Sequence, residues 1–155
     1  MHITYLNYFL ASIISYLGLL LGIILIKMAP EEQKPGKKYF ILLKKILFFI
    51  ILGTLLLFYK ISIILTAIFL SFIIVLIFNK KIKLEKSAFV YILLGAIFYS
   101  SSEIFDLFIL ETVLIFLYGT ITSSIILNVK KRNYYDILIK NLWFFVPVVA
   151  LYFIL

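Results

Sequence analysis

The chain has no cysteine and only one histidine among its 155 residues. Without cysteine there is no disulfide framework, no thiolate nucleophile and no cysteine-based metal site. The single histidine is His2, so a histidine metal site or a histidine general base is not expected. The HExxH, GxSxG and P-loop motifs are absent as well. We therefore expect no metal and no cofactor.

Charged residues are scarce, at 14% of the chain, whereas 65% of the residues are hydrophobic. An ordinary soluble domain has about 25% charged and about 45–50% apolar residues. A soluble domain of this size would expose more apolar surface than water tolerates. The composition therefore predicts an all-α, polytopic integral membrane bundle, with residues 1–155 as a single transmembrane domain and the lipid bilayer as its main partner.

Long apolar runs separate the polar segments, and about 20 apolar residues suffice to cross a hydrocarbon core of about 30 Å. The run over residues 39–79 is too long for one crossing, so we expect a tight turn near Lys60. In the polar loop 27–38, the pair Pro35-Gly36 is expected to end any short helix. About six helices are predicted, at residues 3–26, 40–59, 61–78, 88–102, 104–127 and 135–155.

The basic residues predict an orientation because cytoplasmic loops carry an excess of Lys and Arg. Segments 27–45, 79–87 and 128–141 together hold 14 bases and 4 acids, and six spans place all three segments on one side. We predict that this side is cytoplasmic and that both termini lie outside the cell membrane, with Lys44 and Lys45 reaching back to the inner surface. The cytoplasmic lysines are candidate contacts for anionic lipid head groups. Because the bases sit at the ends of apolar runs, a nucleic-acid partner is not expected despite the net charge of +8.

The acidic residues outside these segments are the best functional lead. Glu103, Asp106 and Glu111 fall within an arc of about 140° if they share one helix, because each residue turns a helix by about 100°. Glu103 and Asp106, with Lys60, form a candidate outer acidic patch, or else they are solvated loop residues. Glu111 lies roughly 10–12 Å along the helix, where an ionised carboxylate facing lipid would cost several kcal/mol.

Tyr118 and Thr122 follow Glu111 at i+7 and i+11, so the three residues share one stripe of the helix. We interpret Glu111, Tyr118 and Thr122 as a candidate polar path that runs inward along this helix. A simpler interpretation stays open, in which Glu111 is a structural pair with Lys60 or with a hydroxyl group from another helix.

Gly18 and Gly22 form a GxxxG motif, and Ser15 continues the same small-residue face. Small residues let helix backbones approach closely, so we predict a packing seam at these three positions. The partner helix comes from the same chain or from a second copy in a homo-oligomer. Tyr8 and Ser12 share this face, and either line a polar pocket or bond back to their own helix.

Two functions remain open on these grounds. A small transporter, or a subunit of a membrane transport complex with partner proteins, would use the polar path for an ion, a proton or a substrate. A structural or assembly protein would use the same groups only to hold helices together. An enzyme is less favoured, because three carboxylates without histidine, cysteine or a metal cluster offer little catalytic machinery.

Overall fold

The computed structural model describes residues 3–62, 64, 71, 88–127 and 134–154. No strand occurs in these ranges, which confirms the predicted all-α bundle. The helix predicted at residues 61–78 and the basic segment 79–87 fall almost entirely outside the described residues. In chain order the elements are α1 (Tyr5–Met28), α2 (Gln33–Phe58), α4 (Ala88–Ser101), α5 (Phe105–Ile126), α6 (Tyr134–Asn141), the 3-10 turn η2 (Leu142–Phe144) and α7 (Phe145–Ile154).

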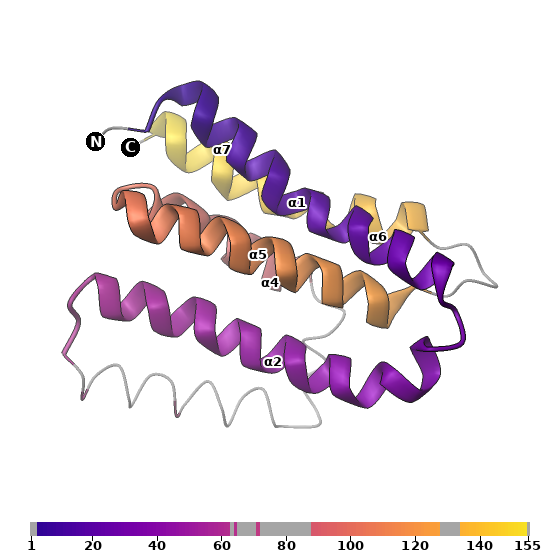
Figure 1. Ribbon diagram of the computed structural model, residues 1–155. Coiled ribbons are helices and arrows are strands. Elements are labelled where there is room, and N and C mark those ends of the chain that lie inside the picture. The colour runs from indigo at the N-terminus through magenta and orange to yellow at the C-terminus, as the bar shows by residue number, and fades with distance from the viewer. Residues whose placement is uncertain (1–2, 63, 65–70, 72–87, 128–133, 155) are drawn as a thin grey trace.

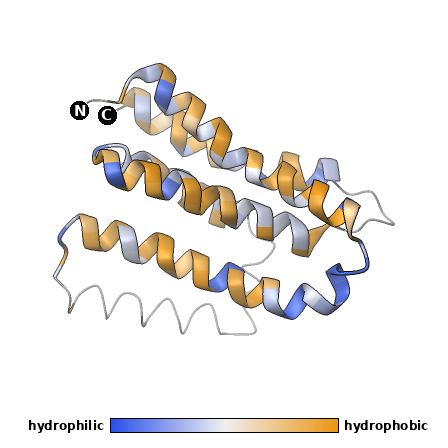
Figure 2. Ribbon diagram, in the orientation of Figure 1, coloured by the Kyte–Doolittle hydropathy of each residue, from blue (hydrophilic) through white to orange (hydrophobic). Residues whose placement is uncertain are grey.

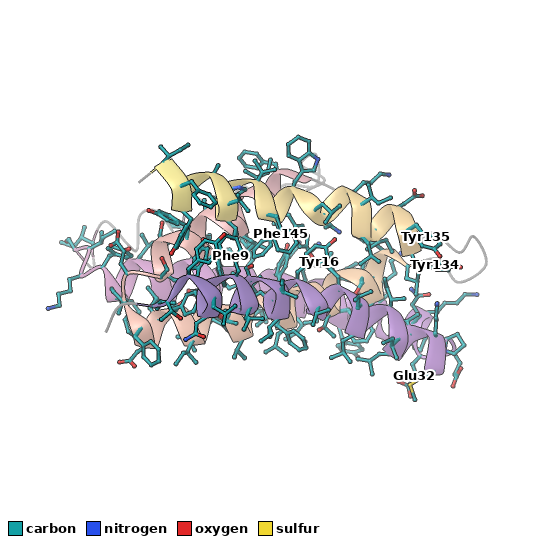
Figure 3. The ribbon with its side chains drawn as sticks, turned by 90° about the horizontal axis from the view of Figure 1, so that it is seen from above. Phe9, Tyr16, Glu32, Tyr134, Tyr135 and Phe145 are labelled. Atoms are coloured by element: carbon teal, nitrogen blue, oxygen red, sulfur yellow. The ribbon has the colours of Figure 1, made fainter. Side chains whose placement is uncertain are left out.

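The long helices lie side by side, with α5 between α1 and α2 (Figure 1). Both termini lie at one end of the bundle, where the ring centroids of Tyr5 and Tyr152 are 5.4 Å apart; we call this the terminal end. The opposite end, which we call the basic end, holds the junction of α1 with α2. There the Lys27 ammonium lies 4.3 Å from the ring centroid of Tyr134. Figure 3 shows Glu32 and Tyr134 at this same end.

The α1–α2 junction is tied to the last turn of α5 by one side chain. Gln33 donates hydrogen bonds from Nε2 to the carbonyl oxygens of Ser124, at 2.9 Å, and Leu127, at 2.6 Å. The last carbonyls of a helix have no partner within the helix, so Gln33 satisfies groups that would otherwise need water. The α1–α2 junction, the end of α5 and the start of α6 therefore meet at one end of the molecule.

The surface of the bundle is apolar along its length and its interior holds polar side chains. Leu6 and Val113 are more than half exposed, whereas Ser12 and Glu111 are fully buried. Figure 2 shows hydrophobic residues along the helices and most hydrophilic residues near their ends. A hydrocarbon solvent favours this arrangement, since lipid tails accept apolar side chains and polar groups bond best inside a bundle.

Among the described residues, four helical segments are long and apolar enough to cross a membrane: Tyr5–Met28, Gln33–Phe58, Phe105–Ile126 and Tyr134–Ile154. Helix α4 is shorter. Its 14 residues extend about 21 Å at 1.5 Å per residue, less than a hydrocarbon core of about 30 Å. The number of about six spans therefore stays a prediction.

Helix α2 begins earlier than the sequence suggested, at Gln33 instead of residue 40, and it runs through Pro35 and Gly36. Pro35 occupies the first turn, where backbone N–H groups have no acceptor within the helix, so its missing donor breaks no bond. The Gly36 N–H group then donates to the Glu32 carbonyl at 3.0 Å and begins the helical ladder. The expectation that this pair interrupts the helix is wrong because the helix starts only two residues before it.

The C-terminus of α2 is a Schellman motif, which turns the chain at Lys60. The Lys60 N–H group donates to the Leu57 carbonyl at 3.0 Å, and the Ile61 N–H group donates to the Leu56 carbonyl at 3.3 Å. Lys60 has a φ of 53°, in the left-handed region that glycine usually occupies at this position. For a residue with a side chain this conformation costs about 1–2 kcal/mol.

The segment from α6 to α7 tightens into η2 just before Pro147. Proline lacks an N–H group, so the Trp143 carbonyl, four residues earlier, loses its usual α-helical donor. A neighbouring helix satisfies another carbonyl at this break: the Tyr16 hydroxyl of α1 donates to Leu138 at 2.6 Å. The proline thus follows a local 3-10 turn, in which the Phe145 N–H group contacts the Leu142 and Trp143 carbonyls, while the bond from Tyr16 satisfies a carbonyl in α6.

Helices α1 and α5 touch through their backbones at three glycines. A Cβ atom at Gly18 would overlap the Phe116 carbonyl, and one at Gly22 would overlap the Thr120 carbonyl. A Cβ atom at Gly119 on α5 would lie 3.1 Å from the Leu19 nitrogen. The small-residue face of α1 thus faces a helix of the same chain.

Two hydroxyl groups on this face of α1 bond differently. Ser12 donates back to the Phe9 carbonyl of its own helix at 2.8 Å. Ser15 donates to the Thr112 carbonyl of the neighbouring helix α5 at 3.2 Å. Of the two, only Ser15 links the helices directly.

Glycine-to-alanine substitutions test the contact between α1 and α5. We expect Gly22→Ala to destabilise the bundle by about 1–3 kcal/mol, because the added methyl group overlaps backbone that cannot move without separating the helices. Gly53→Ala is the matched control: no described atom lies within 4 Å of its Cβ position, so the change should be neutral or slightly stabilising. Thermal unfolding in detergent, followed by circular dichroism, measures both. Equal melting temperatures would show that the contact is not tight.

Candidate functional site

The candidate site is a line of polar contacts between α2 and α5, which we call the α2–α5 seam. The two helices are antiparallel, so residue numbers fall along one as they rise along the other. From the terminal end to the basic end, the contacts are Tyr59 with Glu103, Thr54 with Glu111, and Lys44 with Tyr118.

Glu111 is completely buried in the middle contact of the seam. Its Oε1 atom accepts a hydrogen bond from the Thr54 hydroxyl at 2.6 Å. Its Oε2 atom is buried and has no hydrogen-bond partner among the described residues. Buried ionised carboxylates normally have a cation or several donors, so a single neutral hydroxyl is a sparse environment for this group.

Lys44 belongs to the seam, although the sequence analysis placed its ammonium group at the inner surface. It is only 6% exposed, and its Nζ atom lies 5.3 Å from the ring centroid of Tyr118, within the range of a cation–π interaction. The signal was available in the helical spacing: Lys44 lies at i−3, i−4 and i−7 from the buried residues Leu47, Phe48 and Ile51.

Beyond Tyr118 the polar groups turn toward α4. Thr122 on α5 and Tyr91 on α4 are both buried, and neither hydroxyl has a hydrogen-bond partner of acceptable geometry among the described residues, although the two side chains approach each other. The ring centroids of Tyr91 and Tyr118 are 6.2 Å apart. Glu111, Tyr118 and Thr122 are therefore all buried on α5, with Glu111 facing α2 and Tyr118 contacting both α2 and α4.

The three outer acids do not form one cluster on one helix. Glu103 lies in the turn before α5, so it does not share the arc expected with Asp106 and Glu111. Its Oε2 atom lies 3.0 Å from the Tyr59 hydroxyl. Partial burial, and then this hydrogen bond and the carboxylate charge, raise the pKa of Tyr59 to about 12, which keeps that hydroxyl a donor at neutral pH.

Asp106 and Lys60 are both exposed and stand apart from the seam. Asp106 occupies the first turn of α5, where a negative charge complements the helix dipole. In the part of the chain that the structure describes, Lys60 forms no ion pair with Glu103, Asp106 or Glu111. A hydroxyl group, and not Lys60, is thus the partner of Glu111.

The described ranges contain no group of three His, Cys, Asp or Glu side chains that could hold a metal ion. Comparison of the chain with protein families, curated proteins and solved structures finds no match. The class of the protein therefore follows from its own architecture. It is an all-α membrane protein, in contact with lipid, whose bundle encloses a seam of polar and ionisable side chains.

The hydrogen bond between Thr54 and Glu111 is testable by a nearly isosteric change. We expect Thr54→Val to lower stability by about 0.6–2 kcal/mol, because valine leaves both carboxyl oxygens of Glu111 without a donor. Thr54→Ser keeps the hydroxyl group and should stay close to the wild type. Unfolding by sodium dodecyl sulfate from mild detergent measures the difference. If valine and serine unfold alike, the bond contributes nothing to stability.

Proposed function

We propose that the protein is a small transporter, or the membrane subunit of a transport complex, and that the α2–α5 seam carries an ion or a proton. The observation that supports this function is Glu111, an ionisable side chain that is fully buried and has, among the described residues, one neutral hydrogen-bond partner. Ionisable residues inside membranes are costly and commonly mark the pathways of ions, protons or substrates.

The extent of the seam supports the same function. Lys44 and Tyr59 are fifteen residues apart on α2, which corresponds to about 22 Å along the helix axis. Groups able to bind an ion or a proton thus occur along most of the thickness of a hydrocarbon core of about 30 Å. Glu111 lies between the two ends of this line and is fully buried, so it has no contact with water at either end of the bundle.

We further propose a multi-pass arrangement in the cell membrane, with the basic end cytoplasmic and both termini outside. The support is the excess of Lys and Arg in segments 27–45, 79–87 and 128–141, together with the contact between Lys27 and Tyr134 at that end. The exposed lysines there are placed to contact anionic lipid head groups.

Cysteine labelling tests this orientation, since the chain has no native cysteine. Lys37→Cys at the basic end should be shielded from an impermeant maleimide added to intact cells. Lys60→Cys at the terminal end should react. The two side chains are both exposed, so their reactivity compares sidedness and not burial. The opposite pattern would show the reverse orientation. Labelling of both positions would contradict the prediction that the two ends of the bundle lie on opposite sides of the membrane.

A structural or assembly role is the alternative, and one observation favours it. The bond between Thr54 and Glu111 joins two helices in the way that polar side chains join helices in many membrane bundles. Under this alternative the seam holds α2 against α5 and moves no solute. The two functions predict different effects on ion flux and on folding when Glu111 is replaced by a residue of similar shape that cannot ionise.

Glu111→Gln in proteoliposomes distinguishes the two functions. Charge movement and pH change are recorded with H⁺, Na⁺, K⁺ and Cl⁻ gradients. We expect wild-type flux of at least one ion and a decrease of about tenfold or more in Glu111→Gln, because the group that binds the ion is lost. Asp106→Asn is the control and should keep its flux, because this exposed carboxyl group stands apart from the seam.

The outcomes separate transport from structure. A folded Glu111→Gln variant with lost flux supports transport, whereas loss of the folded bundle supports the structural role. Should the wild type move none of the four ions alone, co-purification with an ATPase or a permease would support the complex-subunit form. Absence of both flux and such a partner would overturn the proposed function.

A further inference from the structure

The Thr54 hydroxyl has three acceptor atoms around it and only one proton to donate. Its Oγ1 atom lies 2.6 Å from Glu111 Oε1, 2.8 Å from the Ile50 carbonyl oxygen and 3.0 Å from the Ile51 carbonyl oxygen. If Glu111 is ionised, the hydroxyl donates to the carboxylate and leaves both carbonyl contacts without a proton. If Glu111 is a carboxylic acid, its O–H group donates to Thr54, and Thr54 donates to Ile50. Only the second arrangement places a proton in both of the shortest contacts.

Among the described residues, no charged side chain forms an ion pair with Glu111 that would stabilise a negative charge. On the α2 side of the seam, Lys44 lies beside Tyr118 and Tyr59 lies beside Glu103, so neither is the partner of Glu111. On α1 the Tyr8 hydroxyl donates to the Val148 carbonyl at 2.9 Å. Residues 63–78, outside the described ranges, contain no charged residue. The titratable groups of α1 are Tyr5, Tyr8, Tyr16 and Lys27. Those of α2 are Lys34, Lys37, Lys38, Tyr39, Lys44 and Lys45, with Tyr59 at its C-cap. Those of α4 are Tyr91 and Tyr99, and those of α5 besides Glu111 are Asp106 and Tyr118, with Glu103 just before the helix.

The ligand set around Glu111 also does not suit a metal cation. Calcium takes six to eight oxygen ligands, and magnesium keeps six in an octahedron. The described residues supply one carboxyl group and one hydroxyl group at this point. A proton needs a single oxygen atom and no cavity, so burial of the group is compatible with binding it.

From this geometry we infer that Glu111 is a proton-binding site, occupied at neutral pH, in which the carboxylic acid donates to Thr54 and Thr54 donates to Ile50. Only the further step, that this proton is the transported or coupling ion, rests on the proposed function. Release of the proton would leave a carboxylate whose remaining donor is Thr54, and Thr54 would then exchange its bond to Ile50 for one to Glu111. The two states differ by one proton and one rotation of the threonine hydroxyl.

Infrared spectroscopy of the purified full-length protein in lipid tests the occupied site. At pH 7 we expect the carbonyl stretch of a protonated carboxylic acid, shifted in D₂O, absent in Glu111→Gln and retained in Glu103→Gln. Thr54→Val should move this band, because the acid loses its acceptor; this second variant serves if Glu111→Gln does not fold. No such band at pH 7, or a band that survives Glu111→Gln and is unmoved in Thr54→Val, would overturn the inference.

Proton flux in the same vesicles separates this inference from the proposed function. With an internal pH indicator and an imposed potential, a Glu111-dependent band together with proton uptake supports both. A Glu111-dependent band without any flux supports the proton site and counts against transport. A third outcome is flux of another ion, independent of the pH gradient, together with no band of a protonated carboxyl at pH 7. This outcome supports transport and overturns the proton site.

Discussion

The backbones of α1 and α5 touch at Gly18, Gly22 and Gly119 because none of these residues has a side chain to separate them. In lipid, van der Waals packing and interhelical hydrogen bonds hold helices together, since the hydrocarbon itself solvates apolar surface. With α1 pressed against one side of α5 and α2 against another, α5 becomes the central helix. A polar residue that faces α2 from this helix is then out of reach of both lipid and water. Glu111 is thus buried on a helix that α1 covers on one side and α2 on another.

The polar side chains inside the bundle differ in whether they need another helix. Serine and threonine hydroxyls can return to a carbonyl of their own helix, and Ser12, Thr112, Thr120 and Ser124 do so at 2.7–3.0 Å. Such residues are buried at little cost and require no partner. The Glu111 carboxyl group bonds instead to a hydroxyl group on another helix, that of Thr54 on α2. Glu111 therefore depends on Thr54, and this dependence separates it from the hydroxyls as a candidate for function.

Hydrophobicity predicted the all-α membrane bundle because a run of about 20 apolar residues has few other stable environments. The sequence also singled out Glu111, since depth along an apolar helix makes a carboxyl group conspicuous. It did not predict the environment of Lys44, because a long lysine can either extend to the interface or turn inward, and only the packing of α2 on α5 decides between the two. The start of α2 was misplaced for a related reason: Pro35-Gly36 is a turn signal in most contexts but is tolerated in the first helical turn. The arc expected for Glu103, Asp106 and Glu111 required the helix to include Glu103, whereas α5 begins at Phe105, and helix starts are the least predictable part of an element.

Glu111 and Lys44 carry opposite charges when ionised, yet the seam keeps them apart. Lys44 contacts Tyr118, seven residues beyond Glu111, which corresponds to about 10 Å along α5. At that separation an ion pair gains little to offset the cost of removing both charges from water, a cost of several kcal/mol per ion. Lys44 has an aromatic ring beside its ammonium group and lies toward the end of the bundle that carries the other lysines. Glu111 has neither a cation nor a second donor among the described residues. The state of lowest electrostatic cost therefore has a neutral acid at Glu111, and a bundle in that state changes its internal charge whenever the proton leaves.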